Sequence, residues 1–457
     1  MSLPPALLAS LEQAPGFQKE NFIAVHEAGP AVHSIRLNPA KLDALPGSLA
    51  PLHAGHVPWN QRGYYLSERP SYTLDPLLHA GAYYVQEASS MFLEEALRQS
   101  ADLVQPLRVL DLCAAPGGKS TLVQSLLSNE SCLVSNEVIK TRAGILAENI
   151  TKWGGANVIV TNNDPRDFQR LPGFFDIIIA DAPCSGSGLF RKDPEAVSEW
   201  SEANVQLCSQ RQQRILADVA PALKEGGILI YSTCSYSAEE DEDITDWLLE
   251  EGGWETVQLK NDPAWQVVET AGKKSGGFGY RFYPDRLKGE GFFITVLRKT
   301  AAAQEVRDNK KLKNEKLSAK ETPVLRPYLQ HPDNFFYIRQ HEDVIAVPTA
   351  MENTFSAVQD KLYIRKAGVK LGTIIRDELV PDHELALATA VSENVRSVSL
   401  DNEQALQYLR REELKTADGM EKGWSLVRYE GLGLGWIKVL PNRINNYYPA
   451  AWRIMNK

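Results

Sequence analysis

The sequence has few features of a secreted, membrane-spanning or metal-binding protein. Its five cysteines form an odd set without a Cys-x-x-Cys pair, which argues against a disulfide framework and against a zinc site. The N-terminal segment has no basic residues before its short apolar stretch, and no run of about 18 apolar residues occurs anywhere. We therefore expect a protein of the reducing cytoplasm, without membrane contact and without a metal.

An excess of positive charge is also missing. The net charge is −9 and the isoelectric point is about 5.6, which is unusual for a nucleic-acid-binding protein when taken over the whole chain. Much of the acidity is local, in residues 239–243, which we interpret as a solvated acidic helix face. Such a face leaves room for a basic groove elsewhere, so the charge does not exclude RNA as a partner.

Short β-branched runs alternate with helical stretches between about residues 105 and 300, and this spacing predicts a parallel, doubly wound α/β sheet. Ser237 and Glu240 have the spacing of a helix capping box. Residues 33–38 alternate as in a short strand, and residues 280–283 and 291–297 form a predicted final strand pair. The other expected strands are 107–112, 132–135, 157–161, 175–180 and 227–232, and the expected helices are 121–127, 140–153 and 205–224.

The first strand of this sheet runs into the glycine turn Cys-Ala-Ala-Pro-Gly-Gly-Lys at residues 113–119. A turn of this kind before a helix presents backbone N–H groups to a ligand at the carboxyl end of the strand. The Gly-Lys-Ser ending is similar to a Walker A loop, but that motif requires glycine where this chain has Cys113. We therefore expect a nucleotide-like ligand, with a purely structural turn as the alternative.

Acidic residues follow four consecutive predicted strands, at Asp111, Glu137, Asp164 and Asp181. Because the carboxyl ends of parallel strands share one edge of a sheet, we expect these carboxylates to line that edge. Glu137 is placed to accept hydrogen bonds from both hydroxyls of a ribose. An acidic edge suits S-adenosylmethionine, whose sulfonium and amino groups are cationic, better than it suits a triphosphate.

Two cysteines follow the fourth and fifth strands, Cys184 in Asp-Ala-Pro-Cys-Ser-Gly and Cys234 in Ser-Thr-Cys-Ser. A single cysteine is more often inert core. Two thiols beside a methyl donor fit a specific reaction, because carbon 5 of a pyrimidine becomes nucleophilic only after a thiolate adds to carbon 6. A carboxyl group such as Asp181 would stabilise the developing charge, and a second thiol or a water would remove the carbon 5 proton. Spacing alone does not decide which cysteine attacks.

At these motifs the chain resembles the Sun-type RNA (cytosine-5) methyltransferase family, and more closely its bacterial RsmF-type branch, which modifies small-subunit ribosomal RNA. The matching segments cover roughly residues 30–300 and are 36–38, 86–91, 111–119, 181–186, 232–235 and 289–293. The resemblance implies a Rossmann-like class I S-adenosylmethionine-dependent methyltransferase core of the α/β class, with a small N-terminal domain and a C-terminal PUA-like RNA-binding region.

The resemblance also implies roles for individual residues. Cys234 is the expected nucleophile, Cys184 is expected to help release the product, and Asp181 completes the catalytic set. DNA cytosine methylases instead attack with the cysteine that corresponds to Cys184. The implied S-adenosylmethionine site consists of Cys113, Ala114, Ala115, Pro116, Gly117, Gly118, Lys119, Glu137, Asp164 and Asp181. The expected RNA contacts are Arg36, Asn38, Arg191 and Lys192.

The expected domains follow from the same resemblance and from the shifts in composition. They are a small N-terminal RNA-binding domain over 1–70, a catalytic domain over 71–300, a linker over 301–325, an intermediate domain over 326–390 and a PUA-like RNA-binding domain over 391–457. In the last domain, aromatic residues such as Trp436 and Tyr448 interleave with basic ones, which would offer ring faces to bases and cations to phosphates. We expect a monomer whose partner is ribosomal RNA or the small ribosomal subunit.

Three alternatives share parts of this pattern. A transfer RNA cytosine-5 methyltransferase would keep the chemistry and change the substrate. A non-catalytic RNA-binding ribosome assembly factor is expected to lose a cysteine or the loop, and both are present here. A nucleotide hydrolase would bind ATP. We predict an enzyme that transfers a methyl group to carbon 5 of a cytosine in small-subunit ribosomal RNA, through a covalent cysteine adduct with a base turned out of the RNA.

Overall fold

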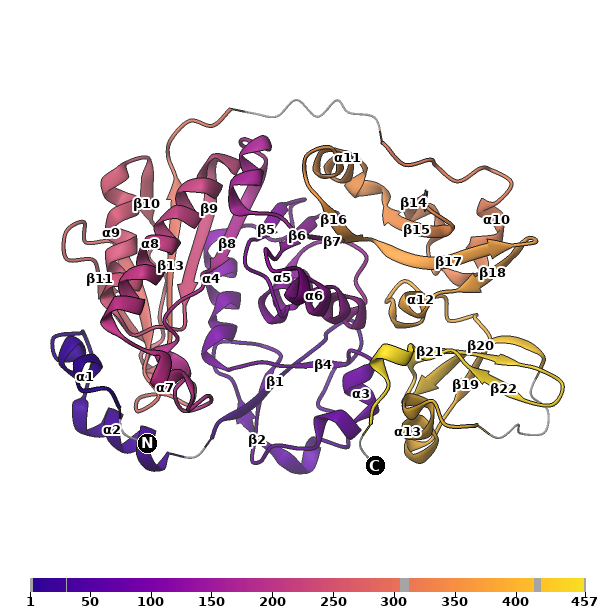
Figure 1. Ribbon diagram of the computed structural model, residues 1–457, viewed down its shortest axis with the longest axis horizontal. Coiled ribbons are helices and arrows are strands. Elements are labelled where there is room, and N and C mark those ends of the chain that lie inside the picture. The colour runs from indigo at the N-terminus through magenta and orange to yellow at the C-terminus, as the bar shows by residue number, and fades with distance from the viewer. Residues whose placement is uncertain (1–2, 30, 305–311, 415–420, 456–457) are drawn as a thin grey trace.

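The computed structural model describes residues 3–29, 31–304, 312–414 and 421–455 (Figure 1). A large central sheet is flanked by the N-terminal helices on one side and by the C-terminal region on the other (Figure 1). Within the described ranges no helix is both long enough and apolar enough to cross a lipid bilayer.

The N-terminal region forms an antiparallel sheet with the strand order β2-β3-β1-β4. The strand predicted at residues 33–38 is confirmed as β1, and β4 shows that this sheet continues beyond residue 70. The elements are α1 (Pro5–Leu11), α2 (Lys19–Ala28), β1 (His33–Leu37), β2 (His53–His56), β3 (Gly63–Leu66), α3 (Pro76–His79), β4 (Tyr83–Val85) and α4 (Leu93–Ser100).

The parallel α/β core predicted from the sequence is confirmed. Strands β6, β5, β8 and β9 pair in parallel, β7 extends them in parallel on the far side of β6, and β13 and β12 add an antiparallel edge. The strands are β5 (Arg108–Asp111), β6 (Cys132–Asn136), β7 (Val158–Thr161), β8 (Phe175–Asp181), β9 (Leu223–Thr233), β10 (Trp254–Thr256), β11 (Val268–Ala271), β12 (Phe278–Phe282) and β13 (Phe292–Lys299).

The apolar runs of the central strands are buried on both faces of the sheet. In β8, Ile177 and Ile179 pack on one face, against α4, α5 and α6, while Ile178 and Ala180 pack on the other, against α8 and α9. Successive side chains of a strand point to opposite faces, so a continuous apolar run marks a strand covered by helices on both sides. With α4, these helices are α5 (Gly118–Leu126), α6 (Lys140–Trp153), α8 (Glu202–Val219) and α9 (Glu242–Glu251). The short helix α7 (Ala196–Glu199) packs instead with the N-terminal helices.

The structure corrects the predicted end of α8 and the predicted start of α9. Helix α8 ends at Val219 because Pro221 has no N–H with which to continue the helix, so β9 already begins at Leu223. The expected capping box is absent, because the Ser237 side chain accepts no capping bond. The Glu240 side chain instead points to other partners in the interior.

The C-terminal region forms two further sheets, ordered β14-β15-β17-β18 and β19-β20-β21-β22. Its strand β16 pairs with β7 and so extends the central sheet. Part of the expected linker is ordered, because Glu315 and Leu317 bond to the backbone of β14. The elements are α10 (Thr322–Leu325), β14 (Phe335–Gln340), β15 (Asp343–Pro348), α11 (Glu352–Lys361), β16 (Ile364–Ala367), β17 (Val369–Ile375), β18 (Glu378–Pro381), α12 (His383–Leu387), β19 (Ser397–Ser399), α13 (Asn402–Arg410), β20 (Gly423–Tyr429), β21 (Leu432–Val439) and β22 (Ile444–Asn446).

The two ends of the chain share one hydrophobic core, which joins β1 and α3 to α13, β20 and β21. Tyr448 packs in this core with its hydroxyl 3.4 Å from the His79 ring. Trp436 is also buried and donates from its indole N–H to the Asp382 carbonyl. These two aromatic side chains are therefore core residues, whereas Tyr447 is exposed and open to a ligand.

Candidate active site

The predicted site residues gather where the parallel strands end. Asp111 at the end of β5 lies beside Ile179 of β8, and Asp181 at the end of β8 pairs in register with Ser232 of β9. The loops that leave these strands therefore face one another across a single edge of the sheet.

Loop 113–119 carries the chain from β5 into α5 (Gly118–Leu126). Gly117 is the N-terminal cap of α5 and has a φ of 118°, in the left-handed region that favours glycine. Side chains from other parts of the chain hold the loop by donating to its carbonyl oxygens. Arg142 donates to Ala115 (2.8 Å), Asn149 donates to Pro116 (2.8 Å), and Arg36 donates to Gly118 (3.2 Å).

A cavity lies beside this loop and is shared between two regions of the chain. Its wall is formed by loop residues, by residues 84–87 at the end of β4 in the N-terminal sheet, and by Asp181. A Cβ atom at Gly118 would come within 3.3 Å of the Tyr84 ring, so a larger residue at this position would require the ring to shift.

The acidic residues at the strand ends have different surroundings. Glu137 is buried, accepts the backbone N–H of Ile139 at 2.9 Å and lies 3.5 Å from the Arg142 guanidinium. Asp164 caps the turn that follows β7 by accepting the N–H of Arg166. A cofactor contact by Asp164 would have to share its carboxylate with this turn.

Asp111 lies beneath the loop and is fully buried, with Ser120 of α5 donating to its Oδ2 at 2.6 Å. Burial raises the pKa of Asp111 to about 7, because the charged form loses its hydration. Its Oδ1 has no hydrogen-bond partner among the described residues. Asp111 therefore braces the loop from below, and of the four carboxylates at the strand ends Asp164 and Asp181 are the partly exposed ones.

Asp181 forms the junction between the cofactor loop and the thiols. Its Oδ2 lies 2.7 Å from Lys119 Nζ, and its Oδ1 accepts the Ser232 hydroxyl at 2.7 Å. Burial alone would lower the pKa of Lys119, but the neighbouring Asp181 carboxylate outweighs it, so the pKa of Lys119 is raised. Lys119 is therefore a cation held at the place where the loop meets the pocket.

The two predicted catalytic thiols lie next to one another. Cys184 Sγ and Cys234 Sγ are 2.9 Å apart, and both side chains are half-buried, so neither is sealed in the core. The hydrogen bond to Cys234, together with burial, raises the pKa of Cys184 well above the ordinary thiol value. Cys184 is therefore protonated at neutral pH.

A third thiol, Cys113, lies in the cofactor loop. Burial raises the pKa of Cys113, which keeps it uncharged, and its side chain packs against the hydrophobic core. Cys113 is therefore suited to line the cavity beside the loop and is not suited to act as a nucleophile.

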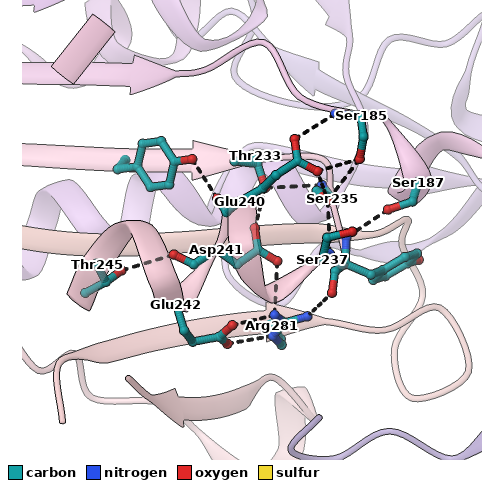
Figure 2. A network of polar contacts seen from close by, with 12 residues as sticks. Ser185, Ser187, Thr233, Ser235, Ser237, Glu240, Asp241, Glu242, Thr245 and Arg281 are labelled. Carbon is teal, nitrogen blue, oxygen red and sulfur yellow. Dashed lines mark hydrogen bonds and ion pairs between the residues drawn. The ribbon is translucent and has the colours of Figure 1, made fainter. Parts of the chain in front are cut away.

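The acidic run at residues 239–243 was predicted as a solvated helix face, and this prediction is wrong. Glu240, Asp241 and Glu242 are buried. Glu242 and Asp241 form ion pairs with the buried Arg281, at 2.5 and 3.2 Å (Figure 2). Composition could not show this burial, because the partner that compensates the charge comes from β12, a distant part of the chain.

Arg36 and Asn38 were predicted to contact RNA, and the structure gives them internal roles instead. Arg36 is only 2% exposed and donates to Gln86 and to Thr121. Asn38 is also buried and donates to the carbonyl oxygens of Gly81 and Trp153. Both side chains tie the N-terminal sheet to the catalytic core, so their donors are not available to a phosphate.

Arg191 and Lys192, after the Cys184 loop, differ from each other. The Arg191 side chain is 6% exposed and lies 3.6 Å from Glu290. Burial raises the pKa of Glu290 to about 7, and Arg191 opposes this shift. Lys192 is exposed. Only Lys192 is placed at the surface where a phosphate could reach it.

The fold and the site together define a class. The sheet has a glycine loop after its first parallel strand and a carboxylate after the second. This strand order and these two features are typical of the cofactor site of a class I S-adenosylmethionine-dependent methyltransferase. The residues present fit this cofactor, since the glycine loop allows close approach and the carboxylates suit its cationic groups. Loop 113–119, Glu137 and Asp181 would hold it.

Comparison with known proteins narrows the class to a family. A family model described as 16S rRNA methyltransferase RsmB/F matches residues 101–298. Models of the RsmF N-terminal domain and of the methyltransferase RsmF PUA domain match residues 3–88 and 395–454. The chain belongs to the RsmB/F family of 16S rRNA methyltransferases.

Individual relatives agree with this assignment. Ribosomal RNA small subunit methyltransferase F of Aliivibrio fischeri is 32% identical over 86% of this chain and 84% of its own length. The protein of the same name from Cronobacter sakazakii is 30% identical over 98% and 95%. The crystal structure of a methyltransferase homologue from Pyrococcus horikoshii is 28% identical, covers 65% of this chain and all of its own, and superposes with a TM-score of 0.52.

Proposed function

We propose that this chain methylates carbon 5 of a cytosine in small-subunit ribosomal RNA, with Cys234 as the covalent nucleophile. The substrate class comes from the names of its relatives, which are small-subunit ribosomal RNA methyltransferases. The observation that carries the chemistry is the pair of half-buried thiols, 2.9 Å apart and adjoining the Asp181–Lys119 pair.

The proposed reaction begins at Cys234. Its thiolate adds to carbon 6 of the ring, and the electrons of the carbon 5–carbon 6 double bond become available at carbon 5. S-adenosylmethionine supplies the electrophilic methyl group. Carbon 5 bonds to the methyl carbon, and the electron pair of the broken sulfur–carbon bond stays on the departing sulfur. Loss of the carbon 5 proton then restores the double bond and releases Cys234 as a thiolate.

Asp181 and Cys184 have complementary tasks in this scheme. The Asp181 carboxyl group, fixed by Ser232 and Lys119, faces the polar edge of the ring, where charge develops during addition. The Cys184 thiol is the group beside Cys234, and its raised pKa makes its thiolate a strong base. After its own proton has passed to water, the Cys184 thiolate would take the carbon 5 proton, and Cys234 would then be released.

Substitution of the two thiols tests the proposal. Cys234→Ser should abolish turnover, and Cys184→Ala should accumulate a covalent RNA adduct that migrates as a shifted band in a denaturing gel. Cys208→Ala is a matched control, because Cys208 is a buried free thiol in α8 and should leave both assays unchanged. Appreciable methylation by Cys234→Ser, or an adduct in the double Cys184, Cys234 variant, would contradict the roles assigned here.

The substrate is tested separately from the chemistry. Isolated small ribosomal subunits, naked small-subunit RNA and bulk transfer RNA should be offered to the same enzyme, with bisulfite sequencing as the readout. We expect the small-subunit RNA to be modified and transfer RNA to remain unmodified. Efficient methylation of transfer RNA alone would replace the proposed substrate while leaving the thiol chemistry intact.

The proposal also covers the location of the enzyme, its oligomeric state and its RNA contacts. A ribosomal RNA substrate would place the enzyme in the bacterial cytoplasm, and the proposed acting unit is a monomer. Lys192 is the proposed phosphate contact near the active site. The exposed ring of Tyr447, beside Trp424 in the PUA-like domain, is available for stacking on an RNA base.

A further inference from the structure

A buried carboxylate joins the two thiol loops from behind. Glu240 precedes α9 (Glu242–Glu251) and is fully buried. Its Oε1 accepts the backbone N–H of Ser185 at 2.8 Å, and its Oε2 accepts the hydroxyls of Ser185 at 2.5 Å and Ser235 at 2.7 Å. Ser185 directly follows Cys184, and Ser235 directly follows Cys234. Figure 2 shows Glu240 reaching both loops at once.

This arrangement has the properties of a rigid clamp. A fourth donor, the buried Gln212 of α8, bonds to Glu240 Oε1 at 3.1 Å and also to the Pro183 carbonyl at 3.1 Å. The backbone of Glu240 is fixed as well, because Tyr231 donates from its hydroxyl to the Glu240 carbonyl at 2.6 Å. The Glu240 carboxyl group thus accepts four hydrogen bonds in a buried setting, and a buried hydrogen-bond network of this kind holds its members in one geometry.

We propose that Glu240 is a positioning residue that sets the separation of the Cys184 and Cys234 thiols through Ser185 and Ser235. The inference rests on the proposed function, because it gives the two thiols successive roles on one base. A nucleophile and a base that act on neighbouring ring carbons must keep a fixed distance and direction, and small displacements cause large losses of rate. Glu240 itself touches neither thiol in this network, so it acts only through the serines.

The loops have other links that should preserve the fold when Glu240 is replaced. Gly188 donates from its N–H to the Cys234 carbonyl at 2.8 Å, and Tyr236 donates from its N–H to Ser187 Oγ at 2.9 Å. Arg281 holds the Tyr236 carbonyl at 2.7 Å. These bonds keep the loops adjacent, while the exact placement of the two thiols depends on the serines that follow them.

The side chain of glutamine tests the clamp with little change in volume. In Glu240→Gln the amide oxygen can still accept the Ser185 N–H, and the amide NH2 can donate to the serine hydroxyls, because a hydroxyl both donates and accepts. Glu240→Ala removes every side-chain contact. Glu239→Gln, next in the chain and only half-buried, is the matched control for the charge.

Three readouts separate positioning from stability, all taken below the unfolding temperature of each variant. For Glu240→Ala we expect kcat to fall on the order of 100-fold, the KM for S-adenosylmethionine to stay within about twofold, and Glu240→Gln to retain most of the activity. A trivalent arsenical, which bonds two adjacent thiols, should bind Glu240→Ala more weakly than wild type and Glu239→Gln as wild type does. Cys184→Ala, which lacks one of the two thiols, gives the background level of arsenical binding.

The two serines should divide the effect between the two chemical steps. Ser235→Ala loosens only the nucleophile loop and should slow adduct formation. Ser185→Ala loosens the other loop and should make the adduct persist, as a milder form of Cys184→Ala. The positioning role would be overturned if Glu240→Ala kept both the kcat and the arsenical binding of wild type. It would also be overturned if Glu240→Ala lost S-adenosylmethionine affinity in step with kcat. The proposed function fails instead if Cys234→Ser, measured alongside, still methylates.

Discussion

The cofactor side and the thiol side of the sheet edge are built in different ways. On the cofactor side, Asp111, loop 113–119 and Ser120 lie in one short segment, and Ser120 bonds to Asp111 only nine residues away. On the thiol side, Cys184 and Cys234 are 50 residues apart in sequence and meet only because β8 and β9 pair in parallel. Glu240 then fixes their loops from the interior.

This difference shows why the two sides should respond differently to substitution. A locally built loop is damaged by a change in its own backbone, and a site built from distant segments is damaged by the loss of whatever joins them. Cofactor affinity and thiol geometry should therefore be separable properties of one active site. The following predictions test that separation.

The largest effect is expected in the loop. Gly117→Val forces a β-branched residue into a φ of 118°, with its Cβ 3.3 Å from Leu146, and this strain costs about 3 kcal/mol. The Kd for S-adenosylmethionine, measured by calorimetry, should rise about 100-fold, while arsenical binding by the two thiols stays as in wild type. Gly226→Val is the control, since Gly226 also has a positive φ but lies near the start of β9, away from the site. An equal loss of affinity in both variants would refute a local cause.

The second prediction concerns pH. Asp111 keeps its proton in the folded chain up to about pH 7, whereas an unfolded aspartate loses it near pH 4, so the unfolded state binds fewer protons in this window. The free energy of unfolding should therefore fall as pH rises from 4 to 7, by about 2–3 kcal/mol between pH 5 and 7. Asp111→Asn, which can still accept from Ser120, should lose this contribution in urea titrations without cofactor and keep the similar contribution of Glu290, whose pKa is also raised to about 7. An unchanged pH dependence in Asp111→Asn would assign it to other groups.

The third prediction tests whether the cofactor side depends only on its own short segment or also on contacts from distant parts of the chain. Arg36 braces the loop from the N-terminal sheet by bonding to Gly118 and Thr121. Arg36→Met should lower the free energy of unfolding by about 2 kcal/mol, because buried acceptors lose their donor. RNA affinity should change little. If Arg36→Met weakens S-adenosylmethionine binding as strongly as Gly117→Val, the cofactor side depends on distant contacts as much as the thiol side does.

The smallest effect is expected at the surface beside the thiols. Lys192→Ala should weaken RNA binding about threefold and reduce the slope of affinity against salt concentration by about one unit, as for the loss of one phosphate contact. Filter binding at several salt concentrations would measure both. Lys224→Ala is a suitable control, because Lys224, at the start of β9, forms an ion pair with Asp176 of β8. A salt slope identical to wild type would remove Lys192 from the RNA path.

Much of the catalytic core was predictable because its signals are local. The helix predicted at residues 140–153 has those bounds as α6, and the alternation of strands and helices gave the parallel sheet. The acidic strand ends could also be found, since strand direction alone places them on one edge. The repeated Cys-Ser pair at 184–185 and 234–235 was the available signal for the clamp, but only the fold shows what the serines contact.

One group of failed predictions concerns charged side chains whose partners lie far away in the chain. Arg36 was interpreted as an RNA contact and the Glu240 segment as a solvated face, because charged residues are normally exposed. Each is buried and bonds to residues distant in the chain: Gln86 and Thr121 for Arg36, Ser185 and Gln212 for Glu240. Strand β16, which extends the central sheet from the C-terminal region, is a long-range pairing of the same kind.

The sequence by itself determined the alternation of strands and helices in the core, the glycine loop and the presence of two thiols and a carboxylate at strand ends, because periodicity and residue type act over a few neighbouring positions. Only the tertiary structure decided which charges are buried, which arginine is internal and how far apart the thiols lie. Those outcomes depend on hydrogen-bond partners brought together from segments that are distant in the chain, and the free energy of burying a charge is acceptable only where such partners meet it.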